Sequence, residues 1–188
     1  FACAFLEDPS IALVALAGPA GSGKTLMALR SALYQICREE NEKSMPLRYD
    51  QILVYLVNRE MGEELGFLPG TASEKFYGYK RPVYDQLDFI FKKMNFVFEG
   101  RKKGTRPRPE DLEKAKLLEI SPINDIQGRT LYRKYIIVDE AQNFTPREMK
   151  AIVTRAGKGA KMILTGDLEQ SLVGIPRVYD SNGLGYTI

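Results

Sequence analysis

The stretch "IALVALAGPAGSGKTLMALRSAL", residues 11–33, places a short apolar run, a glycine-rich turn and an amphipathic segment in direct succession. The run over residues 11–17 is too short for an ordinary helix and is typical of a buried parallel strand. After the turn, apolar residues recur three and four positions apart, so they share one face of a helix. These residues are Leu26, Leu29, Leu33 and Ile36. The stretch therefore predicts a strand, a loop and a helix over residues 24–40 that packs on a sheet.

The turn itself, "GPAGSGKT" at residues 18–25, matches the phosphate-binding pattern GxxxxGK[ST] between a predicted strand and a predicted helix. Its glycines let successive amide N–H groups point at phosphate oxygens, and the following helix adds its positive N-terminal end. Lys24 is expected to reach the β and γ phosphates, and the Thr25 hydroxyl to hold Mg²⁺. A glycine-rich turn without a ligand is the alternative interpretation. The expected nucleotide-binding residues are Gly18, Pro19, Ala20, Gly21, Ser22, Gly23, Lys24, Thr25 and Leu26.

Three further apolar runs have the length of buried strands, at residues 51–57, 135–139 and 160–166. After the third strand, Thr145 is a predicted N-cap, with Pro146 at the first helical position and Glu148 completing a capping box. Gly157 is expected to end this helix. Its predicted inward side chains are Met149, Ile152, Val153 and Ala156. Strands that alternate with helices predict an α/β domain whose sheet is mostly parallel.

Asp139 and Glu140 follow the third strand directly, where a metal and an attacking water need carboxylates. We expect Asp139 to hold Mg²⁺ through water and Glu140 to polarise a water in line with the γ-phosphate. Gln142 is a neutral donor and acceptor suited to sensing that phosphate or water. After the fourth strand, Gln170 is a second candidate sensor. Asp167 is a further catalytic candidate, with a capped turn as the alternative.

Composition sets limits on the other possible functions. The 188 residues are 44% hydrophobic and 27% charged, with a net charge of +3, no histidine and two cysteines far apart. Zinc sites, histidine-dependent triads and cysteine/histidine proteases are excluded. No apolar run approaches the roughly 18 residues that span a bilayer, so we expect no membrane partner and a cytoplasmic protein. The length predicts one domain over residues 1–188.

Residues 70–131 fit the alternation of strands and helices poorly, and a basic surface insertion is predicted within them at about residues 92–115. Five of the eight residues from 101 to 108 are basic: Arg101, Lys102, Lys103, Arg106 and Arg108. They are candidates for tracking a phosphate backbone, with a solvated loop as the alternative. Nearby aromatic residues are candidates for stacking on unpaired bases, with ordinary core packing as the alternative. These are Tyr77, Tyr79, Tyr84, Phe89 and Phe91.

The combination of these motifs resembles a known family. "DEAQ" and "TGDLEQ" resemble the second and third motifs of superfamily 1 helicases, and the full run over residues 136–170 is similar to the PhoH-like ATPases. The segments "GEELGFLPGTASEK", "PVYDQL", "LEISPI", "GRT" and "SNGL" extend the resemblance. It implies a RecA-like core in which the strand bearing Gly166 and Asp167 lies between those bearing the P-loop and the acid pair.

The same resemblance implies ATP hydrolysis, a homo-oligomeric ring with a hexamer as one candidate, and single-stranded RNA as the favoured polymer, with DNA as the other. Relatives continue through a further helix and strand, so we expect truncation after Ile188. A shared ATP site needs an arginine from a neighbouring subunit, for which Arg59, Arg155 and Arg177 are candidates. Two other functions stay open: a non-catalytic ATP-binding module and a small-molecule kinase.

Overall fold

A computed structural model describes most of the chain. The described residues are 2–39, 48–57, 72–94, 96–98, 105–126, 128–170 and 182–188. Residues 101–103, Arg59 and Arg177 therefore lie outside the described part of the chain, as does the side chain of Tyr77.

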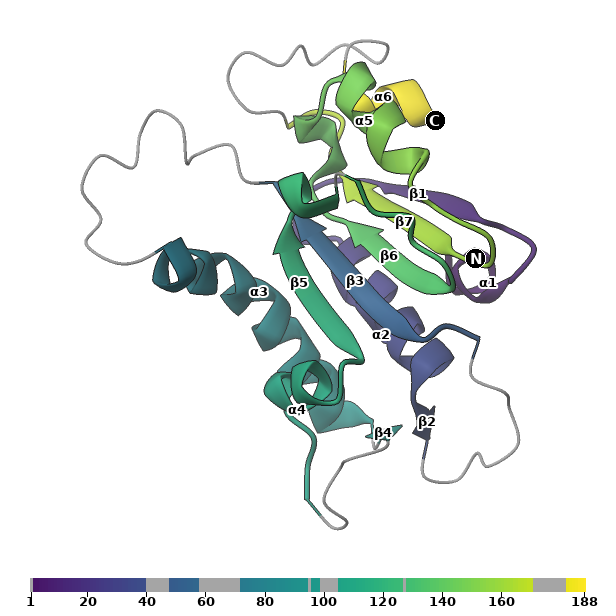
Figure 1. The fold of residues 1–188 in the computed structure, drawn as a ribbon. Helices are drawn as coiled ribbons and strands as arrows, with labels where there is room; N and C mark the ends of the chain where they lie inside the picture. Colours follow the sequence, from purple (N-terminus) through teal and green to yellow (C-terminus); the bar gives the residue numbers. More distant parts are fainter. Residues whose placement is uncertain are drawn as a thin grey trace.

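A five-stranded sheet in which every pairing is parallel forms the centre of the molecule (Figure 1). Its spatial order is β1-β7-β6-β3-β5. The strands are β1 (Leu13–Ala17), β3 (Gln51–Leu56), β5 (Leu118–Pro122), β6 (Lys134–Val138) and β7 (Lys161–Gly166). Because all five run in the same direction, the loops that follow them gather at one edge of the sheet.

The four predicted strands are confirmed, and so is the position of β7 between β1 and β6. Strand β5 was not predicted. Its sequence "LEISP" contains Glu119, Ser121 and a terminal proline, which together give no buried-strand signal. It is an edge strand beside β3, where polar side chains on one face are tolerated.

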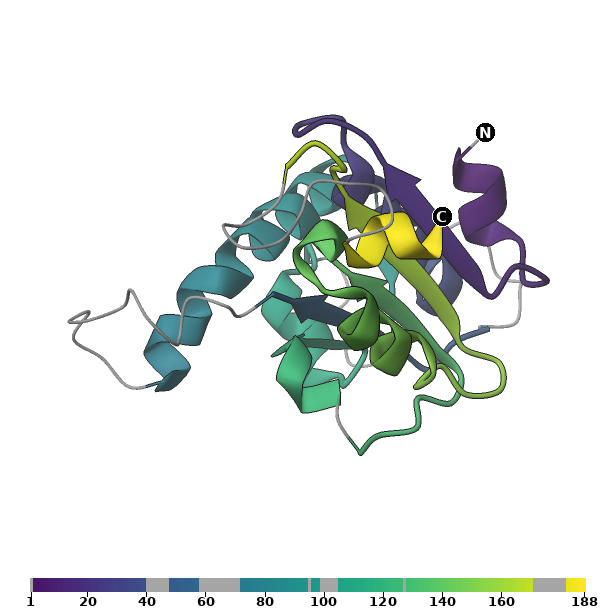
Figure 2. The same cartoon turned by 90° about the horizontal axis from the view of Figure 1, so that it is seen from above.

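Side chains of successive strand residues point to opposite faces of the sheet, and each face carries its own apolar core. On β6, Tyr135 and Ile137 belong to one core, while Ile136 and Val138 belong to the other. Figure 2 shows α3 (Ala72–Lys93) on one side of the sheet, and α5 (Pro146–Val153) and α6 (Gly183–Thr187) on the other. The fold is a three-layer α/β/α arrangement, as predicted.

The first helix after the P-loop, α2 (Lys24–Ile36), packs on the same face as α3 and ends earlier than predicted. Its predicted inward residues Leu29, Leu33 and Ile36 are buried. Cys37 is already extended, and the chain continues into a short strand. This strand is β2 (Arg38–Glu39), which pairs antiparallel with β4 (Phe96–Val97).

Helix α5 has the predicted start. The Thr145 hydroxyl accepts a hydrogen bond from the Glu148 N–H, and the Glu148 carboxylate accepts one from the Thr145 N–H at 2.8 Å. The helix ends at Val153, earlier than the predicted Gly157. Two 3₁₀ turns complete the elements on this side, η1 (Ile123–Ile126) and η2 (Ala141–Asn143).

The described ends of the predicted insertion are anchored in the core. Phe96, on β4, and Leu112, on α4 (Pro109–Lys114), are both 0% exposed. Surface character is therefore limited to part of residues 92–115. Among the aromatic candidates, Tyr84 and Phe91 are buried, as the core alternative holds, whereas Phe89 is half exposed.

Lys161 fixes the N-terminal helix α1 (Ala2–Glu7) to the sheet. Its side chain is buried, and its ammonium donates hydrogen bonds of 2.7 Å to the carbonyl oxygens of Phe5, Asp8 and Ile11. Carbonyls at a helix end have no intrahelical partner, and a lysine ammonium has three N–H donors. These three hydrogen bonds compensate the buried ammonium for the loss of its hydration.

Replacing Lys161 by methionine should lower the free energy of unfolding by about 2–4 kcal/mol, because the carbonyls of Phe5, Asp8 and Ile11 lose the ammonium donor while the apolar stem is kept. Urea unfolding followed by circular dichroism measures the change. Lys158→Met is the matched control, since Lys158 is exposed. Equal destabilisation in the two variants would contradict a specific role for the buried ammonium.

Candidate nucleotide site

The predicted phosphate cradle has the required backbone geometry. Gly21 and Gly23 have φ angles of 74° and 83°, in the left-handed region that glycine adopts without strain. The Gly18 N–H donates to the Gly166 carbonyl at 3.1 Å, which ties the start of the loop to the end of β7. Helix α2 begins at Lys24, so its free N–H groups and positive dipole end lie directly after the loop.

The Lys24 ammonium folds over the loop that precedes it. It donates to the carbonyl oxygens of Gly18 at 2.6 Å and Pro19 at 2.8 Å. A phosphate in the cradle offers the same ammonium stronger, charged acceptors. The contact of Lys24 with the β and γ phosphates stays a prediction.

Thr25 and Asp139 meet although 114 positions separate them in the chain. The Thr25 hydroxyl donates to Asp139 Oδ1 at 2.9 Å, and the Thr165 hydroxyl donates to the same oxygen. A hydroxyl beside a carboxylate is a hard-oxygen pair of the kind that binds Mg²⁺ together with phosphate and water. The residues present therefore fit this metal. Thr165 was missed in the sequence, where it is one more residue of an apolar strand.

Glu140 has a left-handed backbone conformation, with φ 55° and ψ 43°, which is unusual for a residue with a side chain. Strain of this kind collects at functional sites. The Gln142 amide donates to Glu140 Oε2 at 2.6 Å, and its Oε1 accepts from the Asp167 N–H at 3.1 Å. Gln142 thus connects the acid pair after β6 with the end of β7.

The Gln142 side chain is buried between Glu140 and the end of β7. It is 1% exposed, and both the nitrogen and the oxygen of its amide form hydrogen bonds. The hydrogen bond to Glu140 holds that carboxylate in position. The direct contact with phosphate or water stays a prediction. The arrangement needs glycine at position 166, because a Cβ there would overlap Gln142 Oε1 and lie 2.8 Å from Leu184 Cδ2.

Asp167 and Gln170 follow β7 in a tight turn. The Asp167 carboxylate accepts a hydrogen bond from the Glu169 N–H at 3.0 Å, and its carbonyl accepts one from the Gln170 N–H at 3.2 Å. These contacts agree with the capped-turn alternative for Asp167. The Gln170 side chain is exposed, and its role as a phosphate sensor stays a prediction.

A cavity of about 580 Å³ opens beside the P-loop. From the predicted set it is lined by Ala20, Gly21, Gly23, Lys24, Thr25, Leu26, Asp139 and Glu140. Its opposite wall was missed in the sequence and comes from α3. That wall consists of Pro82, Asp85, Gln86 and Phe89. The signal was available, because these residues recur three and four positions apart and so share one face of a helix.

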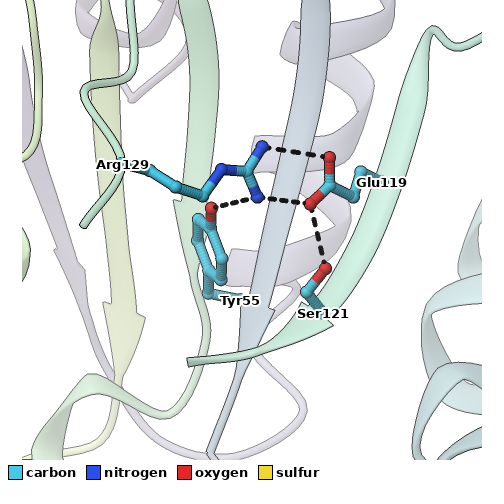
Figure 3. A network of polar contacts seen from close by, with 4 residues as sticks. All are labelled: Tyr55, Glu119, Ser121 and Arg129. Atoms are coloured by element: carbon cyan, nitrogen blue, oxygen red, sulfur yellow. Dashed lines mark hydrogen bonds and ion pairs between the residues drawn. The ribbon is translucent and has the colours of Figure 1, made fainter. Parts of the chain in front are cut away.

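A polar network joins β3, β5 and the loop before β6 (Figure 3). It lies on the face of the sheet that packs against α5. Arg129 donates to Glu119 Oε1 at 2.6 Å and Oε2 at 3.3 Å, and also to the Tyr55 hydroxyl at 3.3 Å. Hydrogen bonding from Arg129 lowers the pKa of Glu119, and burial raises the pKa of Tyr55 to about 12. The "LEISPI" and "GRT" segments thus meet in a structural ion pair that fixes the edge strand.

The fold and site define a P-loop nucleotide-binding protein of the RecA-like class, with the phosphate loop, the acid pair and the third-motif turn at one edge of a parallel sheet. The sequence model described as PhoH-like protein matches residues 4–184. The chain belongs to the PhoH-like family.

Individual relatives agree with this assignment. A PhoH-like protein of Bacillus subtilis is 39% identical over 153 residues, covering 81% of this chain and 41% of the relative. One from Synechocystis is 39% identical over 155 residues, covering 82% of this chain and 40% of the relative. Protein PhoH2 of Bacillus subtilis is 34% identical over 183 residues, covering 95% of this chain and 36% of the relative. The chain thus spans about two fifths of the length of these relatives.

Of the arginines proposed to act across a subunit interface, Arg155 alone lies in the described part of the chain. It is partly buried and follows α5. Within the described ranges, no helix combines the length and the apolar character that crossing a membrane requires.

Replacing Gly166 by alanine should lower the free energy of unfolding by about 1–3 kcal/mol, because the new methyl group overlaps the Gln142 amide. Thermal or urea unfolding measures the effect. Gly78→Ala is the control: a Cβ at this position on α3 meets nothing within 4 Å, so it should raise the stability by roughly 0.5–1 kcal/mol. The same sign of change in both variants would contradict the steric argument.

Proposed function

We propose that this chain binds ATP with Mg²⁺, hydrolyses it, and couples hydrolysis to the remodelling of single-stranded RNA, or of single-stranded DNA, within an oligomeric ring. The observation that carries the proposal is the cavity in which Lys24, Thr25, Asp139 and Glu140 meet. Membership of a P-loop family supports nucleotide binding, and the geometry of these four side chains supports the chemistry.

Each of these groups has a separate role. The P-loop amides and Lys24 bind the phosphates, and Thr25 and Asp139 hold the metal, which when bound neutralises charge that develops on the phosphate oxygens. Glu140 accepts a proton from the attacking water, as its carboxylate lines the same cavity. Gln142 keeps that carboxylate oriented through the 2.6 Å hydrogen bond.

The buried Gln142 amide helps to distinguish this function from the competing ones. A small-molecule kinase shares the P-loop and metal pair, but it has no use for a buried amide that connects the acid pair to the third-motif turn. A non-catalytic module needs the cradle but not an oriented Glu140. Product analysis separates these candidates, because a kinase yields a phosphorylated small molecule and a binding module yields no product.

Lys24→Ala should abolish tight ATP binding, since the β and γ phosphates lose the P-loop ammonium. Glu140→Gln should leave binding intact and lower turnover by roughly 10²-fold or more, because an amide accepts no proton from water. Equilibrium binding of a fluorescent ATP analogue and a phosphate-release assay separate the two effects. If Glu140→Gln retained wild-type turnover, Glu140 would not be the general base, and Asp167 would be the next candidate.

Turnover per subunit should rise with protein concentration, because one RecA-like domain supplies only one side of a shared site. Single-stranded RNA or DNA should raise it further if hydrolysis is coupled to the polymer. Phosphate release measured across a concentration series, with and without each polymer, tests both expectations, and sedimentation gives the assembly state. A monomer with full turnover that neither polymer changes would contradict the ring and the nucleic-acid coupling together.

A further inference from the structure

The cavity beside the P-loop is larger than a phosphate site requires and continues to α3. Leu26, in the first turn of α2, lines it together with Pro82 and Phe89. The P-loop backbone cradles the α and β phosphates at this helix start. A nucleoside attached to the α-phosphate therefore has an apolar surface within the same cavity.

Phe89 differs from its aromatic neighbours on α3. Tyr84 and Phe91 are 8% and 4% exposed and belong to the core, whereas Phe89 is 50% exposed and lies in the cavity wall. An exposed aromatic ring in a ligand cavity is a surface on which a flat ligand stacks. A nucleobase is the flat group that accompanies a triphosphate.

Gln86 lies on the same face of α3 as Phe89 and lines the same cavity. Its Oε1 is buried and has no hydrogen-bond partner within the described ranges of the chain. A buried acceptor without a donor costs free energy, which a ligand that supplies the donor recovers. This oxygen is turned away from the open cavity, so pairing with a ligand requires a rotation of the amide about the last side-chain torsion, which is broad in glutamine.

We propose that Phe89 and Gln86 form a nucleobase subsite on α3 that selects adenine. The base stacks on the Phe89 ring, and its exocyclic amino group donates to Gln86 Oε1. Adenine presents a donor and an acceptor along one edge, which an amide pairs in a bidentate manner, whereas guanine presents two acceptors there. The inference rests on the proposed nucleotide binding at the P-loop and adds the base specificity of that site.

An unpaired base of a nucleic acid is the competing occupant of the Phe89 surface. Arg106 donates to the Asp88 carbonyl at 3.5 Å, so a basic side chain lies close to this part of α3. The cavity itself, however, joins Phe89 to Lys24 and Thr25. That connection favours the base of the nucleotide whose phosphates the P-loop holds.

The test compares ATP, GTP and inorganic tripolyphosphate, each with Mg²⁺, by isothermal titration calorimetry on the intact chain. Phe89→Ala should weaken ATP binding roughly tenfold and leave tripolyphosphate binding unchanged, because only the base loses its stacking partner. Phe89→Tyr should retain ATP affinity. Phe5→Ala is the matched control, since Phe5 is 51% exposed and lies on α1.

Gln86→Leu, a substitution of similar size, tests the hydrogen bond. Wild-type protein should bind ATP roughly fivefold or more tightly than GTP, and the variant should lose most of this preference. Phosphate binding should persist in both.

The outcomes distinguish the inference from the proposed function. Failure of the wild type to bind either ATP or tripolyphosphate would overturn the nucleotide site itself. Unchanged ATP affinity in Phe89→Ala would overturn the subsite alone. If that variant instead bound single-stranded RNA more weakly, Phe89 would belong to a polymer site. Retained preference for ATP in Gln86→Leu would overturn the assignment of adenine selection to this amide.

Discussion

The Asp139 carboxylate is the group on which the site depends. It stands at the end of β6 and accepts hydrogen bonds from Thr25 at the start of α2 and from Thr165 near the end of β7. Three segments remote in the sequence are thereby fixed to one oxygen. A carboxylate in this position is compensated by two hydroxyl donors, and the same oxygen remains the natural ligand for a cation. The same carboxylate therefore fixes the packing of the strand ends and is the proposed ligand of the metal.

A second set of contacts keeps Glu140 in place behind this group. Gln142 is buried, donates to Glu140 and accepts from the Asp167 N–H. Gly166 gives the amide its room, and Leu184 of α6 closes the same space. The C-terminal "SNGL" segment is thus part of the support of the acid pair, because the Asn182 side chain caps α6 and the Gly183 N–H donates to the Phe144 carbonyl. This segment therefore packs against the residues that hold Glu140 in place.

Helix α3 links the cavity to the rest of the domain. One of its faces lines the cavity, while Lys80 and Tyr84 bind Glu113 of α4 at 2.9 and 2.5 Å. Buried Val83, Leu87 and Phe91 fix the helix on the sheet. A ligand that contacts α3 would therefore be connected to α4 through Lys80, Tyr84 and Glu113. Rigid packing of this kind transmits small displacements, since close-packed interiors do not deform gradually.

The sequence by itself determined the P-loop, the acid pair, four of the five strands of the parallel sheet and the capping box of α5. These features are local: glycine spacing, short apolar runs and cap residues act within a few positions. The tertiary structure alone decided the rest. Strand β5 was not predicted because it contains Glu119, whose carboxylate is paired with Arg129 from another segment. The spacing of the α3 residues shows that they share one face, but only the tertiary structure shows that this face lines the cavity and that Thr165 meets Asp139.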